Sequence, residues 1–289
     1  MTSPKVVVAM PAYNEETYIG TMVLKARKYA DRVIVVDDGS TDGTAEISGL
    51  AGAYIIRHPE NKGKGAAIQS ILDEVKKDIP DVLILIDADS QHNPDEIPRL
   101  IKAVLDGYDL VIGSRALVKR DIPSYRRVGQ KVLLYLTRFL TRNKITDSES
   151  GFRAFSRRAI AELELTQKGF AVESEMIAVA EEKNLKITEV PISVKYTKDS
   201  STLNPVRHGL GVFTQIMAMV SERKPLFFFG IVGGLLTLGG LIAGIRVLNV
   251  VSASGVVPMG TVMLSVLLLV IGILSIFTGI ILHILSKRK

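Results

Sequence analysis

Residues 83–92 decide the fold, and they read Leu83-Ile84-Leu85-Ile86-Asp87-Ala88-Asp89-Ser90-Gln91-His92. An apolar run without charge ends abruptly in carboxylates, as a buried strand does where it reaches the surface of a sheet. In open α/β sheets, ligands bind just beyond the carboxyl ends of the strands. The stretch therefore predicts a central strand that delivers acidic side chains to a binding crevice.

The polar end of this stretch has the residue types of a metal site. Asp87, Asp89 and Gln91 alternate, so in an extended chain their side chains point to the same side. Carboxylate and amide oxygens are hard ligands of the kind that Mg²⁺ and Mn²⁺ prefer. Such a cation would hold a diphosphate and neutralise it as a leaving group. The alternative is an Asx-rich turn before a helix that starts at Pro94, because loop carboxylates are often only solvated.

Apolar residues are distributed unevenly along the 289 residues of the chain. Residues 1–224 read as a mixed α/β domain that is long enough to form its own core, whereas residues 226–285 are nearly all apolar. The chain has no cysteine, which excludes disulfides and thiolate chemistry. The first apolar run, Val6–Met10, is too short for a signal peptide, so we expect the catalytic part to stay in the cytoplasm.

Strands and helices alternate through the first part of the chain, which indicates a parallel, doubly wound sheet. The predicted strands are Lys5–Met10 (stopped by Pro11), Arg32–Asp37, Tyr54–Arg57, Val82–Asp87 and Leu110–Ser114. The predicted helices are Tyr18–Tyr29, Thr44–Leu50 and a third that opens at 61–65 and runs to about Lys77. The carboxyl edge of such a sheet collects, in one crevice, Pro11–Glu15, Asp37–Asp42, Asp87–Gln91 and Arg115.

Two loops at this edge admit both a binding role and a plain structural one. Asp38 could accept hydrogen bonds from a ribose or a base, with Tyr13 and Glu15 near the same nucleoside, or it could be a turn aspartate. Gly63-Lys64-Gly65 could bring backbone amides and a lysine to a phosphate, or it could be only a flexible helix start. Its spacing does not match a P-loop.

Four motifs follow one another in a specific order: Pro11-Ala12-Tyr13-Asn14-Glu15-Glu16, Val36-Asp37-Asp38-Gly39-Ser40, Asp87-Ala88-Asp89-Ser90-Gln91-His92 and Gly113-Ser114-Arg115. In this order they resemble the inverting family 2 glycosyltransferases with a GT-A fold, a doubly wound and mostly parallel Rossmann-like α/β sheet. Ser150-Gly151-Phe152-Arg153 and the segment from Gly169-Phe170 to Glu175 are similar to the branch that acts on polyprenyl phosphates, the dolichol-phosphate mannose and glucose synthases. The resemblance covers essentially the whole chain.

The resemblance implies transfer of one hexose, with inversion, from GDP-mannose or UDP-glucose to a polyprenyl or dolichyl phosphate, with Mg²⁺ or Mn²⁺ as cofactor and no nucleic-acid partner. The alternative is another nucleotide sugar or another membrane acceptor. Carried onto this sequence, the resemblance assigns the donor nucleoside to Pro11, Tyr13, Glu15 and Asp38. It assigns the metal and diphosphate to Asp87, Asp89 and Gln91, with Ala88 between them in the donor site, and the phosphates to Arg115. The catalytic candidates are Asp89, Arg115 and Arg127.

A lipid phosphate is already anionic at neutral pH, so its attack needs no strong general base. The enzyme must instead overcome the repulsion between an anionic acceptor and an anionic donor, a task that suits Arg115 and Arg127. Residues 123–143 combine an apolar stripe at helical spacing with interleaved arginines, which is typical of a helix at an anionic membrane surface. A core-facing helix with a solvated basic face is the alternative. In the family, arginines of this region approach the acceptor phosphate, and Arg127 is the best match, with Arg126 in reserve.

The segment before the apolar tail departs from the family. Strands are predicted at Lys186–Val190 and Ile192–Lys195, split by Pro191. The following loop lacks the family's Tyr-Arg and Ser-Lys-Leu elements, which leaves Lys198 and Arg207 as its basic donor-binding candidates. We expect the cytoplasmic GT-A domain to cover residues 1–204 and an interfacial helix to cover residues 205–224.

Residues 225–289 read as a transmembrane hairpin, because the spans 226–250 and 256–285 are each long enough to cross a bilayer. The polar turn would be Asn249–Gly255, and Arg246 is the only charge in either span. Basic residues flank the pair, which places both termini in the cytoplasm. Gly233, Gly234, Gly239, Gly240 and Gly244 offer small surfaces for helix contact, within the hairpin or in a homo-oligomer. Two buried core helices are the alternative.

Three other functions fit the sequence less well. A processive polysaccharide synthase would carry a Gln-x-x-Arg-Trp motif, and the chain has no tryptophan. A sugar-nucleotide pyrophosphorylase would have a glycine-rich N-terminal signature and little reason for a membrane hairpin. The intact acidic motifs argue against a binding protein without catalytic activity.

Overall fold

The computed structural model describes residues 3–115, 145–165, 172–193 and 225–286. The chain divides into two units, Met1–Ile216 and Met217–Lys289. The predicted basic helix at 123–143, the interfacial helix at 205–224 and the candidates Arg127, Lys198 and Arg207 lie outside the described residues.

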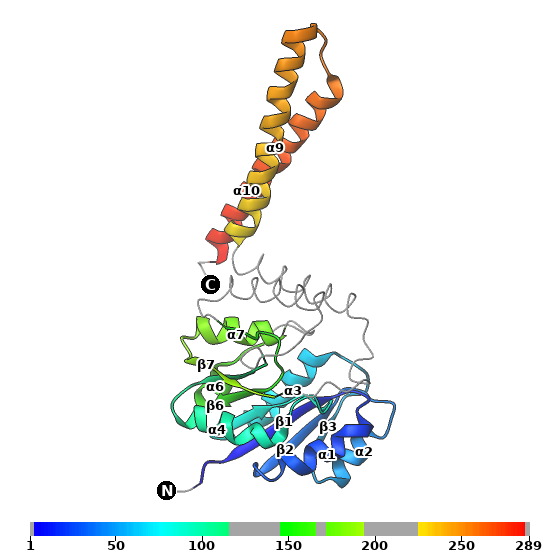
Figure 1. Ribbon diagram of the computed structural model, residues 1–289, viewed down its shortest axis with the longest axis vertical. Coiled ribbons are helices and arrows are strands. Elements are labelled where there is room, and N and C mark those ends of the chain that lie inside the picture. Colours follow the sequence, from blue (N-terminus) through cyan, green and yellow to red (C-terminus); the bar gives the residue numbers. More distant parts are fainter. Residues whose placement is uncertain (1–2, 116–144, 166–171, 194–224, 287–289) are drawn as a thin grey trace. The chain divides into compact units, whose positions relative to one another are not determined.

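The described residues of the first unit form a seven-stranded sheet in the order β3-β2-β1-β4-β6-β5-β7 (Figure 1). The strands are β1 (Val6–Ala12), β2 (Arg32–Asp37), β3 (Tyr54–Arg57), β4 (Val82–Leu85), β5 (Leu110–Ser114), β6 (Arg153–Ser156) and β7 (Ile187–Pro191). β6 runs antiparallel to β4 and β5, and the other neighbouring pairs are parallel. The predicted doubly wound, mostly parallel sheet is confirmed.

Helices cover both faces of this sheet, because its central strands are buried on both sides. In β1, Val6, Val8 and Met10 belong to one apolar cluster, and Val7 and Ala9 belong to the other, as the two-residue period of a strand requires. The first cluster packs against α1 (Glu16–Ala26) and α4 (Ile97–Leu105). The second packs against α3 (Lys64–Val75), α6 (Arg157–Glu162) and α7 (Val172–Glu182).

Several strand ends differ from the prediction. β1 continues through Pro11, which lies opposite Val36, and ends at Ala12. Pro191 is the last residue of β7, opposite Ser114; of the second predicted strand, residues 192 and 193 are not in a strand, and residues 194 and 195 lie outside the described residues. β4 ends at Leu85, although the Ile86 amide still donates to the Ala9 carbonyl at 3.1 Å. Pro11 therefore lies inside its strand, one residue before the end, because proline lacks only the N–H and its other backbone groups can still pair.

The remaining elements show which parts of the fold local sequence patterns predicted. α2 (Thr44–Leu50) and the strands at β2, β3 and β5 have the predicted bounds. α1 begins and ends earlier than the predicted helix. The prediction did not include β6, α6 or α7, and it gave α4, with the short 3₁₀ turn at Pro94–Glu96 before it, only as the alternative to a metal loop.

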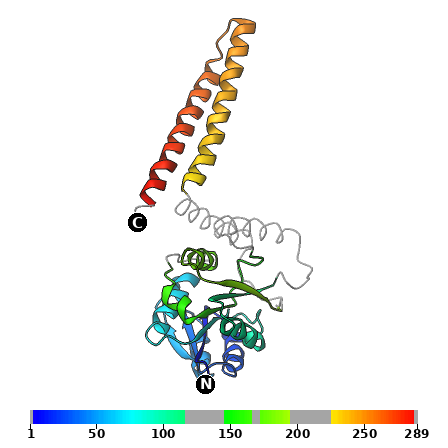
Figure 2. The same cartoon turned by 90° about the vertical axis from the view of Figure 1, so that its left-hand side faces the viewer.

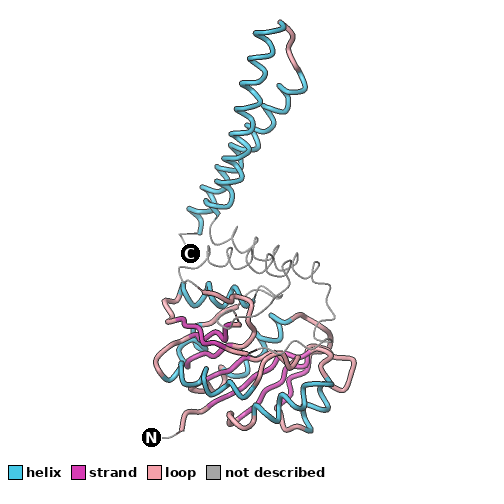
Figure 3. The backbone as a smooth tube through the Cα atoms, in the orientation of Figure 1, coloured by secondary structure: helices cyan, strands magenta, loops and turns pink. Residues whose placement is uncertain are grey.

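The described part of the second unit is a pair of long apolar helices, α9 (Pro225–Ser254) and α10 (Met259–Ser286), which lie side by side (Figures 1 and 2). In their most apolar windows only 11% and 17% of the residues are buried, so they are not core helices of a soluble domain. Both are long and apolar enough to cross a membrane. α9 runs through Asn249, so the predicted polar turn is wrong, and the helices are joined at Gly255–Pro258 (Figure 3).

Small residues line the contact between α9 and α10. Side chains added at Gly233 or Gly240 would meet the backbone of α10. The Ser265 hydroxyl of α10 donates to the Gly240 carbonyl at 2.8 Å. Such small residues let two helix backbones approach closely in a membrane. The glycines do not all serve this contact, however, because nothing lies within 4 Å of a side chain added at Gly234.

Candidate active site

The predicted crevice lies where parallel strands end together. β3, β2, β1 and β4 are parallel neighbours, so the loops that follow β1, β2 and β4 emerge at the same edge of the sheet. These loops are tied to one another. The Asn14 side-chain carbonyl accepts from the Thr41 amide at 2.9 Å, and the Glu15 amide donates to the Thr44 hydroxyl at 2.8 Å.

The acidic stretch after β4 forms a turn and is not extended. Ser90 has a φ of 59°, and the Asp89 carboxylate accepts from the Gln91 amide at 3.0 Å. The expectation that Asp87, Asp89 and Gln91 alternate on one side of an extended chain is therefore wrong. The backbone has the Asx-turn form that the alternative described, and the turn still leaves Asp89 partly exposed at the sheet edge.

Two carboxyl groups at this edge, those of Glu15 and Asp89, have raised pKa values. Burial raises the pKa of Glu15 to about 7, and the charges of Asp89, Asp87 and Asp42 add to the effect. Burial, with the charge of Asp87, raises the pKa of Asp89 to about 6. Carboxyl groups with pKa values raised in this way favour a cation beside them. The edge thus carries negative charge that the described chain compensates only in part.

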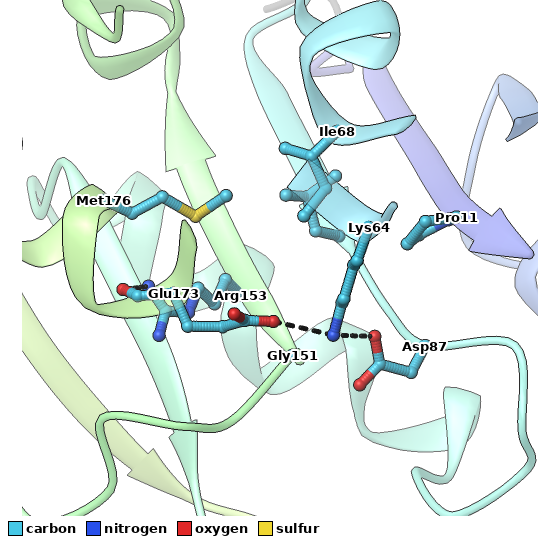
Figure 4. Close-up of a pocket in the computed structure, with 9 residues that line it drawn as sticks. Pro11, Lys64, Ile68, Asp87, Gly151, Arg153, Glu173 and Met176 are labelled. Atoms are coloured by element: carbon cyan, nitrogen blue, oxygen red, sulfur yellow. Dashed lines mark hydrogen bonds and ion pairs between the residues drawn. The ribbon is translucent and has the colours of Figure 1, made fainter. Parts of the chain in front are cut away.

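Asp87 differs from Asp89, because a lysine holds it (Figure 4). The Lys64 ammonium lies 2.6 Å from Oδ1 of Asp87 and 2.7 Å from Oε1 of Glu173. Burial alone would lower the pKa of Lys64, but the two carboxylates outweigh it and raise that pKa. A side chain at Gly151 would collide with the Asp87 carboxylate, so this close approach requires glycine. Lys64 therefore joins the loop after β4 to the first turn of α7.

Asp38 is buried beneath the same loops. Its carboxylate accepts from the Lys62 amide at 3.0 Å and from the Gly63 amide at 2.8 Å, and it lies 2.6 Å from Nδ1 of His58. These contacts fix the backbone directly before Lys64. Asp38 thus has the structural role that the sequence left open, and its predicted contact with the nucleoside stays a prediction. Tyr13, another of the four nucleoside candidates, is exposed.

Arg115 follows β5 and is held by an aspartate that the sequence analysis did not single out. Its Nε and Nη2 donate to the two oxygens of Asp147 at 2.7 and 2.8 Å. Burial alone would raise the pKa of Asp147, but the hydrogen bonds and charge of Arg115 lower it. Glu189 of β7 accepts from the amides of Thr146 and Asp147 and so holds this loop in turn. Glu189 thus holds the loop that carries Asp147, and Asp147 holds Arg115, the arginine predicted to contact phosphate.

Arg153 lies at the start of β6 and is fully buried. Its guanidinium donates to the main-chain carbonyls of Ser150, Glu173 and Ser148 at 2.9, 2.6 and 2.7 Å. The first turn of α7 is therefore pinned to the 148–153 loop. This arginine binds backbone and serves the architecture of the site.

Lys64, Asp147, Glu173 and Glu189 are the site residues that the sequence analysis missed or left unassigned. For the lysine of Gly63-Lys64-Gly65 the sequence left a phosphate contact open; in the structure its ammonium contacts two carboxylates, and the phosphate contact stays a prediction. A general signal was available: acidic residues at a buried sheet edge need cationic partners. Which cation meets which carboxylate depends on segments that are distant in sequence.

The sheet order and the helices on both faces are those of a GT-A-type fold. Residues 7–164 match the family described as Glycosyl transferase family 2, and the chain belongs to this family. It is a glycosyltransferase, as its resemblance predicted.

Curated relatives match most of the chain. It is 32% identical to glycosyltransferase AglJ of Haloferax volcanii, over 95% of this chain and 93% of AglJ. It is also 32% identical to the UDP-N-acetylglucosamine–dolichyl-phosphate N-acetylglucosaminyltransferase of Methanococcus voltae, over 76% of this chain and 97% of the relative.

A solved structure shares the fold. Glucosyl-3-phosphoglycerate synthase from Mycobacterium tuberculosis, crystallised with Mn²⁺ and UDP-glucose, superposes with a TM-score of 0.61 at 23% identity, covering 76% of this chain and 79% of that one. The predicted GT-A fold is confirmed.

Proposed function

We propose that this protein transfers one hexose, with inversion, from a nucleotide sugar to a polyprenyl or dolichyl phosphate in a membrane. One observation carries the proposal: the chain with this acidic sheet edge continues into two apolar helices whose side chains are mostly exposed. A transferase anchored in this way meets acceptors that are themselves in the bilayer. The Methanococcus voltae relative, whose name includes dolichyl phosphate, supports the choice of acceptor.

A divalent cation, Mg²⁺ or Mn²⁺, fits the acidic edge. The carboxyl groups of Glu15 and Asp89 have raised pKa values there, which is the electrostatic signature of a place for positive charge. Among the described residues, no three Asp, Glu or His side chains converge as a complete metal site, so diphosphate oxygens would complete the ligands. Asp87, Asp89 and Gln91 would hold the ion, and one oxygen of Asp87 also contacts Lys64. The ion supplies charge that stabilises the departing nucleoside diphosphate.

The chain's own residues meet the other requirements of the reaction. The acceptor phosphate is an anion, so its attack on the anomeric carbon requires no proton transfer to the protein. His92 is no base in this scheme, because burial lowers its pKa to about 4 and its side chain is enclosed beside Phe152. Arg115, fixed by Asp147, would offset phosphate charge. An α-linked donor would give a β-linked lipid-phosphate sugar.

The donor sugar and the topology belong to the same proposal. GDP-mannose and UDP-glucose are the expected donors, and the name of the Methanococcus voltae relative adds UDP-N-acetylglucosamine to the donors to be tested. Pro11, Tyr13, Glu15 and Asp38 would contact the nucleoside, and Lys198, Arg207 and Arg127 would add basic contacts. The catalytic unit and both termini would lie in the cytoplasm, and the hairpin would permit a homo-oligomer.

The test is transfer by the full-length protein in vesicles that contain a polyprenyl phosphate. Each of the three donors is supplied in turn, with Mn²⁺, with Mg²⁺, or with a chelator. We expect one donor to yield a glycosylated lipid phosphate in the presence of metal. The proposed function would be contradicted if none of the three donors gave a glycosylated lipid phosphate, whether the sugar passed to water or stayed on the donor.

A further inference from the structure

A buried carboxylate oxygen remains without a partner beside the acidic edge. Glu173, in the first turn of α7, is 4% exposed. Its Oε1 contacts the Lys64 ammonium at 2.7 Å, whereas its Oε2 has no hydrogen-bond partner among the described residues. A buried carboxylate oxygen left in this way is costly, so an O–H or N–H donor is expected to approach it.

The unpartnered oxygen belongs to a residue that lines a small cavity (Figure 4). Other walls of this cavity are Pro11 at the end of β1, Lys64, Asp87, Gly151 and Met176. Its volume of about 10 Å³ is room for roughly one water-sized group. A whole hexose ring does not fit there, but a single hydroxyl group does.

The orientation of Glu173 is fixed on two sides. Arg153 donates to its main-chain carbonyl at 2.6 Å, and Lys64 holds one carboxylate oxygen. The side chain therefore has little freedom to turn its second oxygen elsewhere. An acceptor held in this way discriminates between ligands, because a ligand without the matching hydroxyl leaves the carboxylate unsatisfied.

We propose that Glu173 Oε2 accepts a hydrogen bond from one hydroxyl group of the donor's hexose and is a specificity-determining residue of the transferase. This inference rests on the proposed function, which puts the donor diphosphate next to Asp87. A sugar linked to that diphosphate carries the O–H groups nearest to the cavity. Lys64 then has a positioning role: it holds Oε1 of Glu173 and ties this carboxylate to Asp87.

The first test compares two ligands on one variant by calorimetry, with the full-length protein and Mn²⁺. The probes are the best wild-type donor among UDP-glucose, UDP-N-acetylglucosamine and GDP-mannose, and the matching free nucleoside diphosphate. Glu173→Gln should weaken donor binding about tenfold, the effect of one lost hydrogen bond to a charged group. It should leave the affinity for the nucleoside diphosphate unchanged. Glu182→Gln, on the exposed end of the same helix, is the control and should change neither.

The second test uses monodeoxy analogues of the same donor sugar. The loss in kcat/KM caused by Glu173→Gln should vanish with the analogue that lacks the contacted hydroxyl and persist with the others. An equal loss with every analogue, or an equal loss of nucleoside diphosphate affinity, would overturn the proposal and leave Glu173 only a structural partner of Lys64.

Two readouts keep this inference separate from the proposed function. Because glutamine could still accept the hydroxyl, Glu173→Ala is tested with the same pair of ligands. Both ligands are compared on the same variant, so a loss of stability would lower both affinities and would not produce a selective loss of donor binding. If the wild-type protein binds a nucleotide sugar but transfers it to no lipid phosphate, the proposed function fails while the assignment of Glu173 is still tested by binding.

Discussion

The acidic loops at 13–15 and 87–91 and the segment at 145–153 place carboxyl groups at the site whose pKa values are shifted in opposite directions, Glu15 and Asp89 upwards and Asp147 downwards. In the loops, Glu15 and Asp89 have raised pKa values. In the segment, Arg115 binds Asp147 through two hydrogen bonds and lowers its pKa. The comparison teaches that a carboxylate paired with an arginine serves the scaffold, whereas Glu15 and Asp89, which lack such a partner in the described residues, are the ones we propose to bind a cation.

The strongest test of this contrast is Asp89→Ala. If Asp89 binds the metal, its loss should lower transfer about a thousandfold, which corresponds to roughly 4 kcal/mol of transition-state stabilisation. The fold should persist, because the described hydrogen bond of its side chain lies within its own turn. Steady-state turnover and a thermal melt measure the two effects. Asp106→Ala, an exposed aspartate at the end of α4, is the control. Near wild-type turnover would remove Asp89 from the metal site.

The opposite change, in the paired segment, is Arg153→Met. It would remove the hydrogen bonds that Arg153 donates to three main-chain carbonyls, and the positive charge near Glu149 and Glu173. We expect a loss of about 3 kcal/mol in the free energy of unfolding, as for breaking a buried charged network. For a unit of this size, Tm should fall by roughly 6–12 °C.

The matched control is Arg157→Met, because Arg157 also donates to a carbonyl, that of Ile79, but is exposed. It should lower Tm by less than about 2 °C. Equal shifts for the two arginines would show that burial of the guanidinium does not set its contribution.

A smaller effect is expected for Asp147→Asn. The amide still accepts one hydrogen bond, but it no longer balances the charge of Arg115 or holds both of its nitrogens. If Arg115 contacts phosphate only when it is fixed in this position, kcat/KM should fall about tenfold with little change in Tm. Kinetics at matched donor concentration measure this. A fall in Tm without a fall in kcat/KM would make the pair purely structural.

The smallest effect concerns the pH dependence of metal binding. Glu15 and Asp89 have pKa values of about 7 and about 6, above their usual unfolded values near 4, so these two groups bind more protons in the folded protein than in the unfolded chain. Without metal, these groups stabilise the fold at low pH, and that contribution is lost as the pH rises towards 7. Mn²⁺ competes with these protons, so the rise in Tm that it causes should be larger at pH 7.5 than at pH 5.5, by about 2 °C.

Thermal melts with and without Mn²⁺ at the two pH values provide the measurement. In Asp89→Ala the dependence on pH should flatten. An identical Mn²⁺ shift at both pH values in the wild-type protein would show that the acidic loops do not take up the ion.

Much of the fold follows from the sequence, because it depends on local patterns. Short apolar runs that end in polar residues located β2, β3 and β5 at their observed bounds, and two long apolar runs located α9 and α10. The same runs placed Glu15, Asp38, Asp87 and Asp89 at one sheet edge, because parallel strands end together. Residue type and order were enough for these conclusions.

Partnerships between distant segments were decided only by the tertiary structure. The sequence did not reveal that β6 enters the sheet antiparallel between β4 and β5, which brings the 148–153 loop against Asp87. That insertion places Glu173 on Lys64 and leaves one carboxylate oxygen without a partner among the described residues. The physical reason is that a carboxylate's charge and pKa depend on which groups surround it, and those neighbours come from segments whose meeting no local pattern encodes.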